Sequence, residues 1–189
     1  MSRLLKCLRK LVGVFEECEI PYAVLGGLAT PAYSVPRSTV DVDIGLAVSE
    51  AGKLQELVRK LEARKVVAYE MPDREYTMVY MSDRENLVDI ELWFKPDGVK
   101  WDAETLRRRW KVAFKVAGKS FQAYVLSPED FIVNKLSRGD RSARDEEDVA
   151  GVMASSKKID WKYLTRRARD AGVWELAREL KEKVGSLKR

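Results

Sequence analysis

The stretch VDVDIGL, residues 40–46, decides the fold that the sequence predicts. Apolar and acidic side chains alternate in it, and an alternation of period two predicts a β-strand with one buried face. The residues expected to face the core are Val40, Val42, Ile44 and Leu46. Asp41 and Asp43 then project together from the other face. Neighbouring carboxylates repel each other unless a cation lies between them, and oxygen ligands suit Mg²⁺ or Mn²⁺. The pair therefore indicates a metal site, and the alternative is a solvated strand face.

A pair of glycines precedes this strand. The run YAVL, residues 22–25, is expected to be a buried strand, and residues 28–33 can begin a helix. Gly26 and Gly27 lie between them. Because glycine has no side chain, the backbone N–H groups of such a turn can approach a phosphate, helped by the helix N-terminus. The turn is a candidate phosphate-binding site, although many Gly-Gly pairs are plain turns.

Two further residues lie between the glycines and the acids. Arg37 and Thr39 precede Asp41 by four and two residues. We expect them to contact a triphosphate or to orient the metal site. Arg37 is otherwise an ordinary surface arginine.

A third carboxylate lies on a later predicted strand. In LVDIEL, residues 87–92, apolar residues alternate with Asp89 and Glu91. If this strand neighbours the first, Asp89 can be the third metal ligand and a base for an attacking hydroxyl. Two metal ions held by carboxylates are a common arrangement for in-line phosphoryl transfer. Glu91 shares the same face and is the rival for this role.

The composition limits the chemistry that the chain can perform. It has 189 residues, two cysteines and no histidine, which excludes nucleophile schemes with a histidine base and a tetrahedral zinc site. The net charge of +5 is compatible with a nucleotide or nucleic-acid ligand. Abundant charged residues favour a thermophilic source. Since no apolar run is long enough for a membrane span and the start lacks a signal-peptide pattern, we expect a cytoplasmic protein.

The pattern of elements changes near residue 127. Before it, helices are expected at 2–18, 49–64 and 102–109, strands at 66–69, 76–81 and 87–94, and a hairpin at 111–117 and 120–126. Ser127 and Pro128 are a strong helix start, and the rest looks helical. We therefore predict an α+β core over 1–126 and a C-terminal helical subdomain over 127–189, packed on the core.

Basic and aromatic residues outside the motif have two interpretations. The run Arg107-Arg108-Arg109-Trp110-Lys111 could bind RNA, or it could be a solvated face over a packed Trp110. A second cluster, better placed for a triphosphate or an acceptor RNA, comprises Arg138, Arg141 and Arg144. Helical spacing places Trp161, Tyr163, Leu164 and Trp174 in the core.

The combined motifs resemble the polymerase-β-like nucleotidyltransferase superfamily. The matching residues are Gly26-Gly27, Arg37-x-Thr39-x-Asp41-x-Asp43 and Asp89. The run SPEDFIVNKL, residues 127–136, followed by Arg144-Asp145 and Asp148, resembles the branch that contains AbiEii-type toxin and related nucleotidyltransferases. Together these segments cover most of residues 22–150.

The resemblance implies a nucleotidyltransferase-like mixed sheet with flanking helices, an acidic cleft, Mg²⁺ and a nucleoside triphosphate. In such proteins the turn and the following helix hold phosphate, and three acids hold metal. The matching positions are Gly26, Gly27, Asp41, Asp43 and Asp89. Many members have serine in place of the second glycine, and its hydroxyl contacts phosphate, which Gly27 cannot do.

The same branch uses a lysine and a nearby acid in its helical part. Here they would be Lys135 and either Asp145 or Asp148. Lys135 could instead form an ordinary ion pair with Glu129 or Asp130.

The sequence thus predicts transfer of a nucleoside monophosphate (NMP) from a nucleoside triphosphate (NTP) to a hydroxyl acceptor, with pyrophosphate as the second product. The acceptor is a tRNA or other RNA, a protein or a small molecule. The chain could also be the toxin of a toxin–antitoxin pair with an antitoxin protein as partner. The alternatives are a non-catalytic nucleotide- or RNA-binding protein with the same fold and a purely structural partner protein.

Overall fold

A computed structural model describes residues 2–35, 37–48, 51–70, 77–155 and 159–186. Contacts within the chain divide it into two compact units. The first unit comprises Met1–Leu28, Ser38–Pro96 and Arg109–Val125, and the second comprises Ala29–Arg37, Asp97–Arg108 and Leu126–Arg189. The predicted α+β fold with a mixed sheet is confirmed.

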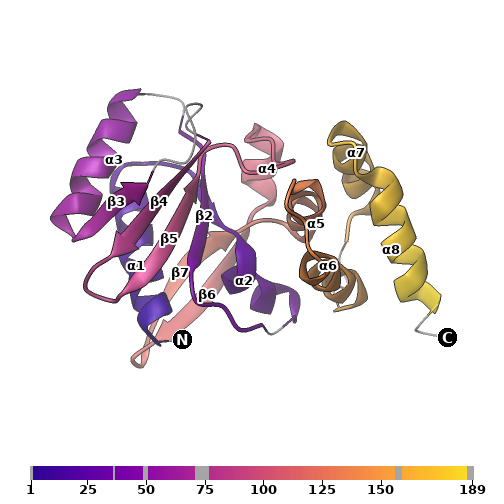
Figure 1. Cartoon of the computed structure of the whole chain (residues 1–189), viewed down its shortest axis with the longest axis horizontal. Coiled ribbons are helices and arrows are strands. Elements are labelled where there is room, and N and C mark those ends of the chain that lie inside the picture. The colour runs from indigo at the N-terminus through magenta and orange to yellow at the C-terminus, as the bar shows by residue number, and fades with distance from the viewer. Residues whose placement is uncertain (1, 36, 49–50, 71–76, 156–158, 187–189) are drawn as a thin grey trace. The chain divides into compact units, whose positions relative to one another are not determined.

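The first unit contains a sheet whose described strands run in the order β3-β4-β5-β2-β1-β7-β6 (Figure 1). The strands are β1 (Tyr22–Val24), β2 (Val42–Leu46), β3 (Val66–Glu70), β4 (Met78–Asp83), β5 (Val88–Trp93), β6 (Trp110–Val116) and β7 (Lys119–Val125). The pairs β2–β5 and β1–β7 are parallel, and the other pairs are antiparallel. The central strand β2 thus lies between a parallel and an antiparallel neighbour.

Strand β2 buries one face as the alternation predicts. Val42, Ile44 and Leu46 have no exposed surface, and Ile90 of β5 is equally buried. The expectation that Val40 joins this core is wrong, because its side chain is 77% exposed. The paired register begins with Val42 opposite Ile90, so Val40 lies before the strand. The buried face of this strand therefore begins at Val42 and not at Val40.

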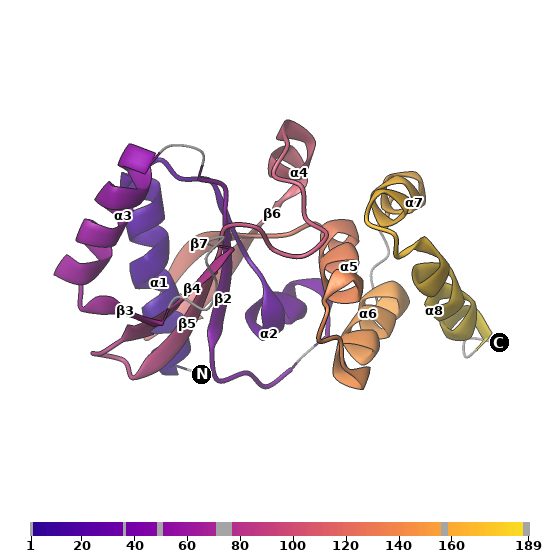
Figure 2. The ribbon, with the colours of Figure 1, turned by 45° about the horizontal axis from the view of Figure 1, so that its top comes forward.

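Two helices, α1 (Ser2–Glu17) and α3 (Ala51–Ala63), cover one face of this sheet and lie side by side (Figures 1 and 2). Helix α1 matches the helix predicted over 2–18 and buries Leu4, Leu8, Leu11 and Phe15. The predicted helix cap Ser49 and the predicted strand start Tyr76 lie outside the described residues.

The second unit is built from the 3₁₀ turn η1 (Thr30–Tyr33) and from helices. These are α4 (Ala103–Arg108), α5 (Pro128–Ser137), α6 (Ala143–Ser155), α7 (Trp161–Asp170) and α8 (Trp174–Ser186). Ser127 caps α5 by accepting a hydrogen bond from the Asp130 amide, and Asp160 caps α7 in the same way. The Ser127 cap follows the predicted helix start, and in both caps a side-chain oxygen satisfies an amide that the helix leaves unpaired.

Two earlier segments of the chain belong to this helical unit. The Tyr33 ring packs on Phe131, and its hydroxyl donates to the carbonyl of Leu126. Asp102, which precedes α4, accepts two hydrogen bonds from the buried Arg167 of α7. The domain division at residue 126 stays a prediction, and these contacts show that the helical unit draws on more of the sequence than residues 127–189.

Candidate active site

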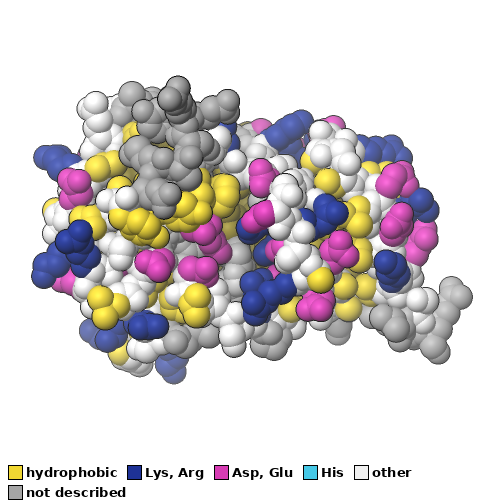
Figure 3. Space-filling view, in the orientation of Figure 1, with side chains coloured by type: hydrophobic (Ala, Val, Ile, Leu, Met, Phe, Trp, Pro, Cys, Tyr) yellow, Lys and Arg dark blue, Asp and Glu magenta, His cyan; other side chains and the backbone are white. Residues whose placement is uncertain are grey.

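Acidic side chains lie together on the face of β2 and β5 opposite α1. The parallel register places Asp43 directly opposite Glu91 and Val42 opposite Ile90. Asp89 lies two residues earlier on the same face of β5, and Asp41 immediately precedes β2. Figure 3 shows acidic side chains gathered over this part of the sheet. We call Asp41, Asp43, Asp89 and Glu91 the acidic face.

The Gly26 turn brings the backbone close to Asp43. The Leu25 amide donates to the Asp43 carbonyl at 2.8 Å, which extends the antiparallel pairing of β1 and β2. Gly26 has a φ of +52°, and a Cβ built on it would lie 1.6 Å from Asp43 Oδ2. Only glycine therefore fits beside this carboxylate without displacing it. Helix α2 (Gly26–Ala29) begins at the same residue, two residues before the helix start that the sequence predicts, and Thr30–Tyr33 continues it as the 3₁₀ turn η1.

Thr39 connects the second glycine of the turn to Asp41. Its hydroxyl donates to Asp41 Oδ1 at 2.6 Å. A Cβ on Gly27 would lie 2.7 Å from the Thr39 Cβ and 2.8 Å from its hydroxyl oxygen. The absent side chain at Gly27 thus makes room for Thr39, which orients the Asp41 carboxylate.

Asp89 and Glu91 have different surroundings. The indole Nε1 of Trp93 donates to Glu91 Oε2 at 3.1 Å, and Glu91 is half-buried. Asp89 is exposed. Glu91 is therefore held by its own strand, whereas Asp89 is open to a ligand from solvent. Both residues remain candidates for the third carboxylate.

The donor set of the acidic face fits a hard divalent cation, since all its donors are carboxylate oxygens. In the part of the chain that the structure describes, no three acidic, cysteine or histidine side chains converge closely enough to hold a metal ion. Carboxylates on one face repel each other. They would therefore have to move closer together around a cation, and the carboxylate packed against the Gly26 backbone has the least freedom to do so.

A second group of predicted site residues lies in the helical unit. Lys135 Nζ lies 2.7 Å from Asp145 Oδ1 and 3.5 Å from Asp148 Oδ2. Arg37 pairs with the same Asp148 oxygen. The side chains of Lys135, Asp145 and Asp148 are 4%, 10% and 7% exposed, so these charges have little access to water. We call these four residues the ion cluster.

The alternative pairing of Lys135 with Glu129 or Asp130 is wrong. Glu129 accepts a hydrogen bond from the Asp160 amide. Asp130 accepts hydrogen bonds from the Tyr163 and Ser127 hydroxyls. Both acids are engaged elsewhere, Glu129 with the start of α7 and Asp130 with Tyr163 and the α5 cap.

The ion cluster has a strongly perturbed carboxyl group. Burial raises the pKa of Asp145, but hydrogen bonds from Lys135 and Ser142 outweigh it and lower the pKa to about 2. Asp145 is therefore ionised at neutral pH. Arg37 Nε is buried and has no hydrogen-bond partner within the described residues. One donor of that guanidinium is thus unsatisfied.

The structure brings the predicted residues together in two groups, one in each unit. Gly26, Gly27, Thr39, Asp41, Asp43 and Asp89 belong to the sheet unit, and Arg37 and Lys135 belong to the helical unit. Sequence reasoning missed the Trp93 contact to Glu91 and the sharing of Asp148 by two cations. The sequence did contain a sign that Asp148 joins the same cluster, because Asp145 and Asp148 are three residues apart and lie on one side of a helix.

The sequence profile of the family described as "Nucleotidyltransferase of unknown function (DUF6036)" matches residues 2–185. This chain belongs to that nucleotidyltransferase family. The predicted superfamily is therefore confirmed, and the AbiEii-type branch stays a prediction. No curated protein matches the sequence.

Solved structures show the same fold at low sequence identity. An antigenic nucleotidyltransferase-like protein from Paracoccidioides brasiliensis is 18% identical, with a TM-score of 0.54 over 95% of this chain and 94% of that one. The antibiotic-resistance factor ANT(2'')-Ia is 18% identical, with a TM-score of 0.55 over 95% of this chain and 100% of that one. The lincosamide antibiotic adenylyltransferase LnuA is 16% identical, with a TM-score of 0.50 over 80% and 97%.

Among the helices of the described residues, none is long and apolar enough to cross a membrane. This agrees with the absence of a long apolar run in the sequence.

Proposed function

We propose that this nucleotidyltransferase moves an NMP from an NTP to a hydroxyl acceptor, with a divalent cation, Mg²⁺ or Mn²⁺, as cofactor. The observation that carries the proposal is the position of the acidic face beside the Gly26 turn. Where a carboxylate is held against a glycine backbone, the carboxylate oxygens can bind a cation. The backbone amides of the same turn can then donate to the phosphate group that this cation binds.

Asp41 and Asp43 would hold the cation, and Asp89 would complete its ligand set. The bound cation would neutralise charge that develops on the phosphate oxygens. Thr39 orients Asp41 through the 2.6 Å hydrogen bond, and Gly26 keeps space for Asp43. Asp89 would also accept the proton of the acceptor hydroxyl, because it is exposed, whereas Glu91 is half-buried and accepts a hydrogen bond from Trp93.

Arg37 and Lys135 are proposed to interact with the triphosphate from the ion cluster. The Nε of Arg37 has no hydrogen-bond partner among the described residues, which supports this role, since such a buried donor is costly and a phosphate oxygen would satisfy it. Lys135 supplies positive charge whose position is fixed by Asp145. Catalysis would then rest mainly on positioning and charge neutralisation.

Calorimetry with ATP, CTP, GTP and UTP, each with and without Mg²⁺ or Mn²⁺, tests the first step. We expect NTP binding that requires the cation. If the wild-type protein binds no NTP under any of these conditions, the proposal is wrong.

Transfer of α-³²P label to total RNA, protein or small-molecule extracts tests the second step. Asp41→Asn and Asp43→Asn should each lower transfer by about 10³-fold or more, because a ligand lost from a metal site removes transition-state stabilisation. The matched control Asp140→Asn changes an acid that is 74% exposed and should transfer label normally. Loss in Asp89→Asn with activity retained in Glu91→Gln supports the assignment of Asp89, and the reverse pattern assigns Glu91.

A further inference from the structure

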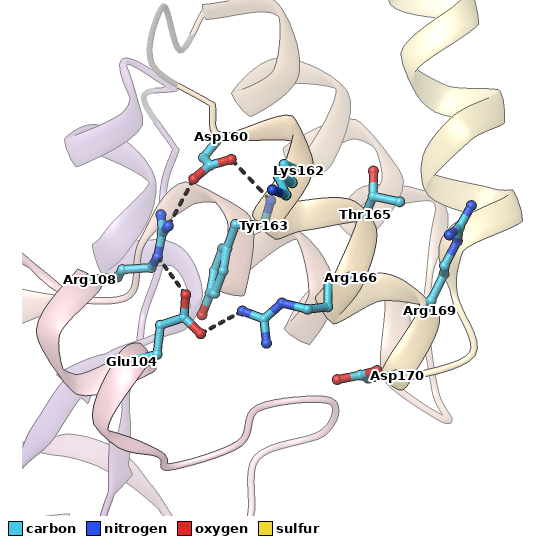
Figure 4. Close-up of a pocket in the computed structure, with 9 residues that line it drawn as sticks. All are labelled: Glu104, Arg108, Asp160, Lys162, Tyr163, Thr165, Arg166, Arg169 and Asp170. Carbon is cyan, nitrogen blue, oxygen red and sulfur yellow. Dashed lines mark hydrogen bonds and ion pairs between the residues drawn. The ribbon is translucent and has the colours of Figure 1, made fainter.

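Helices α4 and α7 of the helical unit enclose an open groove with a volume of about 640 Å³ (Figure 4). The charged and polar residues that line it are Glu104, Arg108, Asp160, Lys162, Thr165, Arg166, Arg169 and Asp170. Tyr163 forms its floor, with the Arg108 guanidinium 3.9 Å from the ring centroid. None of these residues is part of the acidic face or of the ion cluster.

Carboxylates in the groove neutralise only part of its positive charge. Arg108 pairs with Asp160 at 2.8 Å, and Arg166 pairs with Glu104 at 2.5 Å. Asp170 pairs with Lys100, which lies outside the groove lining. All three acids of the groove are therefore already engaged.

Two basic side chains of α7 form no ion pair with another described residue and could contact a ligand. Lys162 and Arg169 are exposed, and neither forms an ion pair with another described residue. They are seven positions apart, which is about 10 Å along a helix, and Thr165 lies between them on the same side. These two positive charges suit an extended chain of negative charges.

Two half-buried tryptophans lie near the two ends of α7. The prediction that Trp161 and Trp174 belong to the core is wrong for these two residues, because both keep partial exposure while Tyr163 and Leu164 are buried. Lys181 lies 3.8 Å above the Trp161 ring, and Arg169 lies 5.8 Å from the Trp174 ring. Basic side chains beside partly exposed aromatic rings are typical of surfaces that bind single-stranded nucleic acid.

We propose that this face of α7 binds the phosphodiester backbone of a single-stranded RNA and so selects RNA as the acceptor class. Lys162 and Arg169 would each contact a phosphate, the Thr165 hydroxyl would donate to a phosphate oxygen between them, and bases would stack on the tryptophans. That the bound RNA is the acceptor of the NMP rests on the proposed function. RNA binding itself does not depend on catalysis.

Fluorescence anisotropy with a labelled single-stranded RNA of about 12 nucleotides tests the inference, without NTP or divalent cation and over a series of salt concentrations. Lys162→Glu/Arg169→Glu should weaken binding at least tenfold. A milder variant, Lys162→Gln/Arg169→Gln, should lower the slope of log K against log salt by about 1.4, as expected for two lost phosphate contacts. Thermal unfolding of both variants checks that the helical unit stays folded.

The matched control is Lys115→Glu/Lys119→Glu, which makes the same charge change at two exposed positions of the β6–β7 hairpin. We expect it to bind within about threefold of the wild type, since screening weakens long-range effects at physiological salt. Equal weakening in the control and the α7 variant would overturn the inference, as would a wild type that binds no RNA.

The test separates this inference from the proposed function. Asp41→Asn should bind the RNA like the wild type while losing label transfer. If the wild type shows cation-dependent NTP binding and no RNA binding, the RNA inference fails and the proposed chemistry stands. If it binds RNA but no NTP, the proposed function fails.

Discussion

The acidic face and the ion cluster differ in how their charges are paired and in how much of each side chain is exposed. The acidic face carries three carboxylates on the neighbouring strands β2 and β5 and a fourth, Asp41, directly before β2, and Asp89 is open to solvent. The ion cluster pairs two cations with two carboxylates, and three of its four side chains are at most 10% exposed. Negative charges accumulate in the first, whereas charges balance in the second.

This difference separates two physical roles. Buried charges are tolerated when each has a partner, and removal of one partner leaves an uncompensated charge. Like charges on one face repel each other, and in the proposed function a bound cation would offset this repulsion. We therefore expect substitutions in the ion cluster to affect stability most and substitutions in the acidic face to affect binding most.

The largest stability effect is expected for Lys135→Met, which keeps the aliphatic stem and removes the charge. Asp145 would then be left buried without its cation, and the free energy of unfolding should fall by about 3–5 kcal/mol in urea titrations. The control Arg138→Met breaks an exposed pair with Asp140 and should cost at most about 1 kcal/mol. If both variants lost the same stability, the ion cluster would be no different from a surface pair.

The ion cluster also sets a pH dependence with a definite sign. Because the folded pKa of Asp145 is lowered from 3.8 to about 2, its contribution to stability is present above pH 4 and is lost as the pH falls towards 2. In Lys135→Met the burial that raises this pKa is no longer opposed by Lys135. The ¹³C titration of the Asp145 carboxyl group should therefore move to higher pH.

An intermediate effect is expected for Gly26→Ala, which links backbone strain to the acidic face. The added Cβ would displace the Asp43 carboxylate, and alanine disfavours the φ of +52°. Stability should fall by about 1–2 kcal/mol, and cation-dependent NTP binding should weaken as well. Gly13→Ala is the control, since nothing lies within 4 Å of its Cβ in α1 and alanine favours helix. Unchanged NTP binding in Gly26→Ala would contradict the proposed fit between the turn and Asp43.

The smallest stability effect is expected for Asp43→Asn. Neutralising one acid of a like-charged group removes repulsion, so the free energy of unfolding should stay within about 0.5 kcal/mol of the wild type. The same variant should lose cation-dependent binding of NTP. Destabilisation as large as that of Lys135→Met would show that Asp43 has a structural role instead.

Much of the fold was predictable because local signals agreed with one another. The alternation around Asp43 predicted β2, and the Ser127-Pro128 start predicted α5 with its cap. Val40 was misplaced because alternation alone does not show where the paired register begins. Trp161 and Trp174 were misplaced because helical spacing tells which residues share a side, not how much of that side is covered.

The unit boundaries were less predictable. Residues 29–37 and 97–108 join the helical unit through contacts such as Tyr33 with Phe131 and Arg167 with Asp102. These contacts connect residues that are 65 or more positions apart. No local composition or periodicity carries that information.

By itself the sequence determined the nucleotidyltransferase motif, since its acids and glycines are identifiable from residue type and spacing, and the family resemblance adds Lys135 with Asp145 or Asp148 as predicted site residues. Only the tertiary structure decided how those residues are held: Asp43 against Gly26, Thr39 on Asp41, and Lys135 between Asp145 and Asp148. Residue types and local periodicity follow from the chain alone. Strand register and helix packing determine which distant side chains are in contact. Those contacts set the burial and the electrostatic surroundings of each site residue.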